Sequence, residues 1–84
     1  MSFSVENLSW VRELPKFTDD EQKVLLALSD DRYEWRTKRG IARVTGLEDD
    51  RVESILAALM TADLVRPSFS QQREVIYGLE ERVH

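Results

Sequence analysis

The sequence has 84 residues, of which 42% are hydrophobic and 33% are charged, so it has the size and composition of one small globular domain. It contains no cysteine, which excludes a disulfide framework, a thiolate nucleophile and a cysteine-type zinc site. Its net charge of −4 has the wrong sign for an average nucleic-acid-binding domain.

Residues 1–17 form the first predicted segment, which is either an extra helix or an arm that docks on the rest of the chain. Its apolar side chains follow no single helical face: Phe3, Val5, Leu8, Trp10, Val11 and Leu14. Leu14-Pro15 should interrupt any helix, because proline disfavours helical backbone in the residue before it. Trp10 is a candidate interface anchor, for a homodimer among other partners, or else packs onto the first helix of the main domain.

Residues 18–84 are predicted to form the main domain. The stretch from Thr18 to Glu21 has the S/T-x-x-E pattern of a capping box and predicts a helix over residues 19–29. This helix should bury Val24, Leu25 and Leu28. Tyr33 and Trp35 then alternate with charged residues over 32–36, which is the period of a short half-buried strand, and we expect one or both rings to fill the core.

Two further helices are predicted in the middle of the chain. Thr37 can cap a helix of about eight residues, with Ile41 and Val44 facing inward. Gly46 should end this helix at positive φ, because glycine adopts that conformation without a steric penalty. The third helix carries one apolar stripe with helical spacing, and the residues expected in the core are Ile41, Leu47, Val52, Ile55, Leu56 and Leu59.

A β-hairpin is predicted after the third helix, which should end near Asp63. The first strand begins around residues 64–66, a polar turn occupies 70–73, and a strand returns over 75–79 with alternating apolar residues. Pro67 lacks an amide donor and therefore belongs at a sheet edge or beside the turn.

This order of elements resembles a winged helix-turn-helix, the broad class that includes MarR-like and ArsR-like regulators. The resemblance rests on core and turn residues: Ile41-Ala42, Thr45-Gly46-Leu47, Val52, Ile55-Leu56, Leu59 and Leu64-Val65, with Tyr77 to Arg82 similar to the second wing strand and its exit. The stretch WRTKRGIARVTGL also resembles a variant found as a small module of larger prokaryotic proteins. The resemblance implies a mainly α-helical fold with a small antiparallel wing, in the order α-β-α-α-β-β.

The sequence offers few groups for catalysis. His84 is the only histidine, the three glycines are scattered, and the paired aspartates lie at presumed helix ends, where carboxylates complement the helix dipole. We therefore expect no enzyme activity, no cofactor and no metal. We also expect a cytoplasmic protein, because the sequence shows neither a signal peptide nor an apolar run of membrane-spanning length.

The candidate binding surface follows from charge that is banded along the chain. Residues 32–47 carry a net charge of +4, and the segments 1–31 and 48–64 on either side carry −4 each. The candidate contact residues are Arg36, Lys38, Arg39 and Arg43 around the second helix, Asp50 and Ser54 on the outer face of the third, and Arg66 and Arg73 on the wing. For the cations, the alternative is a solvated face that pairs with Asp50 or Glu53.

The third helix opens with three carboxylates, Glu48, Asp49 and Asp50. They either complement the helix dipole or accept from base edges, and in both interpretations they would repel the phosphates of a duplex. We therefore predict a non-catalytic recognition module that contacts a protein partner or a neighbouring domain in a regulatory protein. The alternative is a DNA-binding regulator that contacts phosphates through the second helix and the wing.

Overall fold

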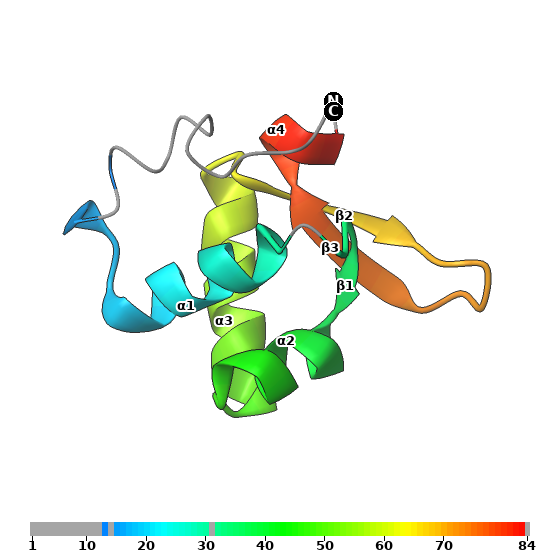
Figure 1. The fold of residues 1–84 in the computed structure, drawn as a ribbon, viewed down its shortest axis with the longest axis horizontal. Coiled ribbons are helices and arrows are strands. Elements are labelled where there is room, and N and C mark those ends of the chain that lie inside the picture. The colour runs from blue at the N-terminus through cyan, green and yellow to red at the C-terminus, as the bar shows by residue number, and fades with distance from the viewer. Residues whose placement is uncertain (1–12, 14, 31, 84) are drawn as a thin grey trace.

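The computed structural model describes residue 13 and residues 15–30 and 32–83. Its elements are α1 (Asp19–Leu28), β1 (Arg36–Thr37), α2 (Lys38–Thr45), α3 (Asp49–Thr61), β2 (Val65–Phe69), β3 (Val75–Leu79) and α4 (Glu80–Val83). Helices α1, α2 and α3 pack together, and the β2–β3 hairpin projects away from them as a wing (Figure 1). This is the winged helix-turn-helix fold that the sequence predicts, with α4 as an addition that it did not predict.

The ends of the first two helices follow local sequence signals. The Thr18 hydroxyl accepts from the Glu21 amide at 3.2 Å, and the Glu21 carboxylate accepts from the Thr18 amide at 2.9 Å, which completes the capping box. The Thr37 hydroxyl accepts from the Gly40 amide at 3.0 Å and so caps α2. Gly46 ends α2 with a φ of 76°, and its predicted conformation is confirmed.

The sheet is antiparallel, with strand order β1-β3-β2, so β3 is central and β2 is an edge. Pro67 lies on this edge, as its missing amide hydrogen predicts. Three cross-strand pairs share the face of the hairpin that turns toward the helices: Val65–Leu79, Pro67–Tyr77 and Phe69–Val75. Only the first pair lies in the core, so the other two extend this apolar face outward along the wing.

The core lies between the three helices and the base of the wing. Its buried residues are Val24, Leu25, Leu28, Ile41, Val52, Ile55, Leu56, Leu59, Val65 and Leu79. Leu47, which we expected to be buried, packs against the core but is only half-buried. Val44 is 56% exposed, which corrects the expected inward position. The inner face of α2 is centred between Ile41 and Thr45, and Val44 lies to one side of it.

The first strand is shorter than predicted, because β1 contains only Arg36 and Thr37. Tyr33 is 50% exposed and does not fill the core. Trp35 is half-buried against β3, where its ring would lie 3.1 Å from a Cβ placed on Gly78. Trp35 therefore covers the sheet at the central strand, and only glycine at position 78 allows this close approach.

The predicted N-terminal arm falls mostly outside the described residues, and so does Trp10. Phe17, at the end of the arm, packs against the core, and its carbonyl accepts from the Gln22 side-chain amide at 3.0 Å. The domain boundary at residues 17 and 18 and the role of Trp10 stay predictions. No helix in the described ranges is both long and apolar enough to cross a membrane.

Candidate recognition surface

A groove of about 660 Å³ lies between the helices and the inner face of the wing. We call it the wing groove, and its lining residues are Thr37, Lys38, Arg39, Asp49, Glu53, Glu74, Val75 and Tyr77. The first turn of α2 and the N-terminal part of α3 line one side of this groove, and the hairpin lines the other. The groove therefore gathers charged residues from two helices beside apolar residues of one strand.

Arg39 and Arg43 lie one helical turn apart, and both are exposed on α2, as predicted. Within the part of the chain that the structure describes, neither guanidinium makes an ion pair or a hydrogen bond. Lys38 differs, because its Nζ lies 3.6 Å from the Glu53 carboxylate. The alternative of a solvated, paired face therefore describes Lys38, while the two arginines are available to a partner.

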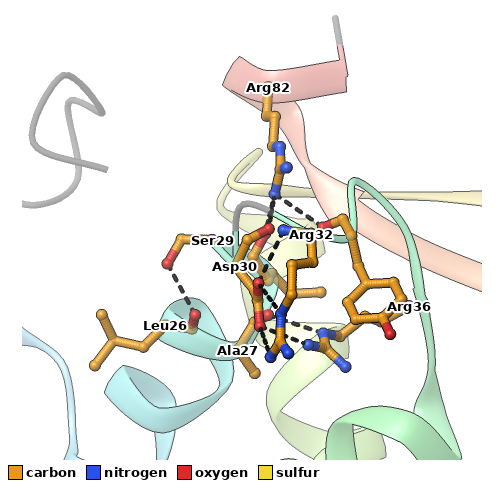
Figure 2. Close-up of polar contacts among 9 residues, drawn as sticks. Leu26, Ala27, Ser29, Asp30, Arg32, Arg36 and Arg82 are labelled. Carbon is orange, nitrogen blue, oxygen red and sulfur yellow. Dashed lines mark hydrogen bonds and ion pairs between the residues drawn. The ribbon is translucent and has the colours of Figure 1, made fainter. Parts of the chain in front are cut away.

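Arg36 points inward and does not extend this exposed patch, contrary to our expectation. Its side chain is 12% exposed, its Nε donates to the Ala27 carbonyl at 3.0 Å, and its guanidinium lies 4.6 Å from the centre of the Tyr33 ring. Its Nη2 also donates to the Asp30 carboxylate at 3.1 Å (Figure 2). Arg36 therefore fastens β1 to the end of α1. The distribution of charge along the sequence places Arg36 in the same basic segment as the arginines of α2. It does not indicate that the Arg36 side chain points inward.

The Asp30 carboxylate is the centre of the segment between α1 and β1 (Figure 2). It accepts two hydrogen bonds from the Arg32 guanidinium, at 3.0 and 3.2 Å, and one from the Arg32 amide at 2.9 Å. The hydrogen bonds from the Arg32 side chain and amide hold the pKa of Asp30 well below its usual range. These bonds close a local turn, which is the physical reason why the strand begins later than its sequence pattern predicts.

Arg82 on α4 holds the same segment from the other end of the chain. It donates to the carbonyls of Leu28, Asp30 and Tyr33 at 3.3, 2.6 and 2.9 Å. Two of these carbonyls close the C-terminal end of α1, where a cation is favourable. Sequence analysis missed Arg82, because nothing in its local surroundings indicates a partner more than 50 residues earlier in the chain.

The outer face of α3 carries Asp50 and Ser54, and both are exposed as predicted. Glu48 makes no side-chain hydrogen bond to cap the helix, so its carboxylate acts on α3 through the helix dipole alone. Arg51, the only cation of α3, lies 3.1 Å from the Asp20 carboxylate of α1. The exposed face of α3 therefore presents carboxylates and a hydroxyl but no unpaired cation.

The two arginines of the wing differ in their surroundings. Arg66 lies 2.9 Å from the Glu80 carboxylate and is held to the base of the wing. Arg73 lies in the turn with a φ of 65°, a left-handed conformation that is uncommon for a residue with a side chain. The turn is closed by Ser70, whose hydroxyl accepts from the Glu74 amide at 3.1 Å. The Arg73 guanidinium is exposed and makes no ion pair with any described residue.

No metal site emerges from these residues: the described part of the chain holds no group of three or more histidine, cysteine, aspartate and glutamate side chains that could bind an ion. Asp50 and Ser54 lie apart from the wing groove lining, and so do Arg66 and Arg73. The surface thus has two parts, an acidic and apolar groove and an outer set of arginines.

No family model matches the chain, and no curated protein matches it. Among solved structures, the chain is similar to Bordetella bronchiseptica BpsR, in a study of how 6-hydroxynicotinic acid regulates the DNA binding of that protein. The TM-score is 0.67 and the identity 22%, over 77% of this chain and 46% of the BpsR chain. At this identity the likeness establishes the winged helix-turn-helix fold. The matched part is less than half of the BpsR chain.

Proposed function

We propose that this chain is a DNA-binding winged-helix module of a transcriptional regulator and has no catalytic step of its own. It contacts the phosphates of a duplex through Arg39, Arg43 and Arg73. The exposed pair on α2 carries the proposal, because two guanidinium groups one turn apart have no competing partner in the described part of the chain. The likeness to BpsR, a protein with regulated DNA binding, favours this function over the protein recognition that the sequence first indicated.

The wing tip supports the same function. An arginine at a φ of 65° is uncommon, and glycine would fit that conformation at lower cost. The hydrogen bonds of the turn hold Arg73 in this conformation, which places its side chain at the wing tip. A guanidinium at the end of a projecting hairpin can reach the backbone of a duplex that lies against the helices.

The acidic first turn of α3 sets the mode of binding. Bases in the major groove are read mainly by arginine, asparagine and glutamine side chains, and the exposed face of α3 has Asp50 and Ser54 in their place. Phosphate contacts position a protein on DNA without specifying sequence. We therefore expect weak, salt-dependent binding with little sequence preference, at the weak end of the usual non-specific range of about 10⁻⁴–10⁻⁶ M.

A titration of labelled duplex at several salt concentrations tests this proposal. Each phosphate contact contributes about 0.9 to the slope of log K against log salt, so the double variant Arg39→Gln/Arg43→Gln should lower the slope by roughly 2. Lys23→Gln, which removes a cation from the exposed face of α1, is the matched control and should change the slope little. If the double variant binds like the control, α2 is not the phosphate-contacting surface.

Protein recognition keeps one specific observation in its favour. The wing groove holds three carboxylates, those of Asp49, Glu53 and Glu74, against the two cations Lys38 and Arg39. Because the carboxylates outnumber the cations, the lining as a whole favours a cationic partner over a phosphate backbone.

A further inference from the structure

The carboxylates of the wing groove are unequally compensated. The Lys38 ammonium lies 3.6 Å from Glu53, so these two charges largely offset each other. Asp49 on α3 and Glu74 beside β3 also line the groove. Neither carboxylate makes an ion pair or a side-chain hydrogen bond within the described ranges. The α3 wall and the wing wall therefore each present one uncompensated negative charge.

The wing wall of the groove is apolar beyond its carboxylate. Tyr77 packs against the core and reaches into the lining, and Val75 next to it is 41% exposed. Phe69 pairs with Val75 across the hairpin and is 72% exposed. Side chains of a cross-strand pair share one face of the sheet, so Phe69 continues this apolar strip toward the wing tip.

We propose that the wing groove binds a short basic segment of a protein partner, in which a lysine or arginine lies beside an apolar side chain. The cation is attracted by Asp49 and Glu74, and the apolar side chain packs against Val75 and Phe69. Arg39, on the α2 wall, donates to a backbone carbonyl of the segment. Charge complementarity selects this occupant, because two uncompensated carboxylates outnumber the one unpaired guanidinium, that of Arg39, in the same space.

This inference goes beyond DNA binding and does not depend on it. The two proposals share Arg39, which lines the groove, but the peptide is attracted by the carboxylates of the inner lining, whereas DNA binding also uses Arg43 and Arg73, which lie outside it. A groove of about 660 Å³ is also within the range of about 300–1,000 Å³ in which proteins bind compact ligands. The size suits a few side chains of a peptide and not a whole domain.

The first test titrates the ¹⁵N-labelled full chain with the capped peptide acetyl-Ala-Lys-Leu-Arg-Leu-Lys-Ala-amide at physiological salt. The amide resonances of the groove lining should shift on titration. A control peptide with glutamine at its three basic positions should bind at least several-fold more weakly, because it lacks the charges that the carboxylates attract. Equal affinity for the two peptides would overturn the proposal.

Variants of single carboxylates show which negative charges attract the peptide. Glu74→Gln and Asp49→Asn should each weaken peptide binding by roughly two- to fivefold, the usual effect of one exposed ion pair. Asp63→Asn removes the same charge from the far end of α3, where Asp63 is exposed, and should leave the affinity unchanged. Loss of affinity in all three variants alike would show a general charge effect and would overturn the assignment to the groove.

A pair of valine variants locates the apolar contact. Val75→Ser should weaken peptide binding, whereas Val44→Ser, at a valine that is 56% exposed outside the groove lining, should not. Circular dichroism and thermal unfolding confirm that both variants fold. If Val75→Ser folds and binds the peptide like the wild-type protein, the apolar strip has no part in binding and the proposal is wrong in this respect.

A duplex titration separates this inference from the proposed function. If DNA shifts the groove resonances and the basic peptide does not, the groove belongs to the DNA surface and the inference fails. Arg43→Gln reports on DNA alone, since Arg43 lies outside the lining, and should leave peptide affinity unchanged. The two proposals can therefore fail independently.

Discussion

Asp30 shows how one carboxylate can determine where an element begins. It lies between α1 and β1, and its carboxylate accepts from both Arg32 and Arg36. The guanidinium of Arg36 is thereby drawn inward, next to the Ala27 carbonyl at the end of α1. Loss of this one carboxylate would leave Arg36 with a single carbonyl acceptor and would release the turn that precedes β1.

The pKa of Asp30 makes its contribution depend on pH. Hydrogen bonds from the Arg32 side chain and amide lower this pKa in the folded state, so the stabilisation is complete above the unfolded-state pKa of about 3.9. It is lost as the pH falls through the folded pKa. Asp30→Asn should therefore lower the urea midpoint near pH 7, and the difference from wild type should shrink as the pH falls below about 4.

Glu34→Gln is the control for this experiment, because Glu34 is exposed in the same segment and its carboxylate makes no ion pair or hydrogen bond with any described residue. Its urea midpoint should follow that of the wild-type protein at both pH values. A constant difference between Asp30→Asn and wild type across this pH range would mean that the ionised carboxylate of Asp30 contributes nothing to stability.

Gly78 is the residue where the sheet tolerates no side chain. A Cβ there would lie 3.0 Å from the Glu34 carbonyl oxygen and 3.1 Å from the Trp35 ring. We expect Gly78→Ala to lower the free energy of unfolding by about 1–3 kcal/mol in urea denaturation, the usual cost of overpacking. Adding Val83→Ala removes the contact at 2.9 Å but not the backbone oxygen, so it should restore little. A fully stable Gly78→Ala would show that residues 34–35 move aside freely.

Among the elements, α3 has two faces with different roles: its inner face belongs to the core, and its first turn is acidic. Its inner face builds the core through Val52 and Ile55, so the fold requires this helix whatever its outer face binds. Its first turn carries Asp49 and Asp50 at the end that a duplex would approach. Charge at this end therefore acts on partner choice much more than on the fold.

Neutralising the first turn of α3 should strengthen DNA binding. Replacing Glu48, Asp49 and Asp50 by Gln, Asn and Asn removes three charges that repel phosphates, and we expect at least a tenfold gain in duplex affinity at low salt, a change of about 1.4 kcal/mol. The same titration of labelled duplex measures it, at two salt concentrations. The gain should fall at the higher salt because screening weakens the repulsion. Nanomolar, sequence-selective binding by wild type that the variant loses would instead mean that these carboxylates read bases.

The types and order of the elements could be predicted wherever the signal is local. The capping box at Thr18, the cap at Thr37 and the left-handed Gly46 each act within a few residues of their position, and each is present in the structure. The start of β1 and the contacts of Arg82 could not be predicted in this way. Arg82 meets carbonyls as far as 54 residues away, and the start of β1 depends on a turn closed by Asp30 and Arg32 that the alternating pattern of 32–36 does not show.

The features of the candidate site were also predicted where the signal is local and missed where it is not. Exposure of Arg39, Arg43, Asp50 and Ser54 follows from helical periodicity and was predicted. The wing groove was not, because it exists only where the hairpin faces the first turns of α2 and α3. Its apolar strip includes Phe69, which no periodic pattern singled out.

At the scale of the whole molecule, the position of the described core leads to a prediction about which part of the chain folds on its own. Among the residues that the structure describes, the buried core lies between positions 24 and 79, and Phe17 packs against it from just outside α1. We therefore expect a chain that begins at residue 15 to unfold cooperatively in urea, with a midpoint close to that of the full chain. Mass measurements on both chains test pairing through the predicted arm, since a dimer that becomes a monomer on truncation assigns the contact to residues 1–14. Loss of the cooperative transition would show that the domain boundary is wrong.

Pro67 limits the ways in which this molecule can associate. An edge strand offers its free amides and carbonyls to any extended chain, and such edges allow uncontrolled aggregation as well as recognition by strand addition. β2 is that edge here, and proline in an edge strand places its missing N–H on the open side. A chain that added along β2 would meet a methylene where it needs a donor. The wing therefore offers an added strand an interrupted backbone edge and favours partners that bind its side chains.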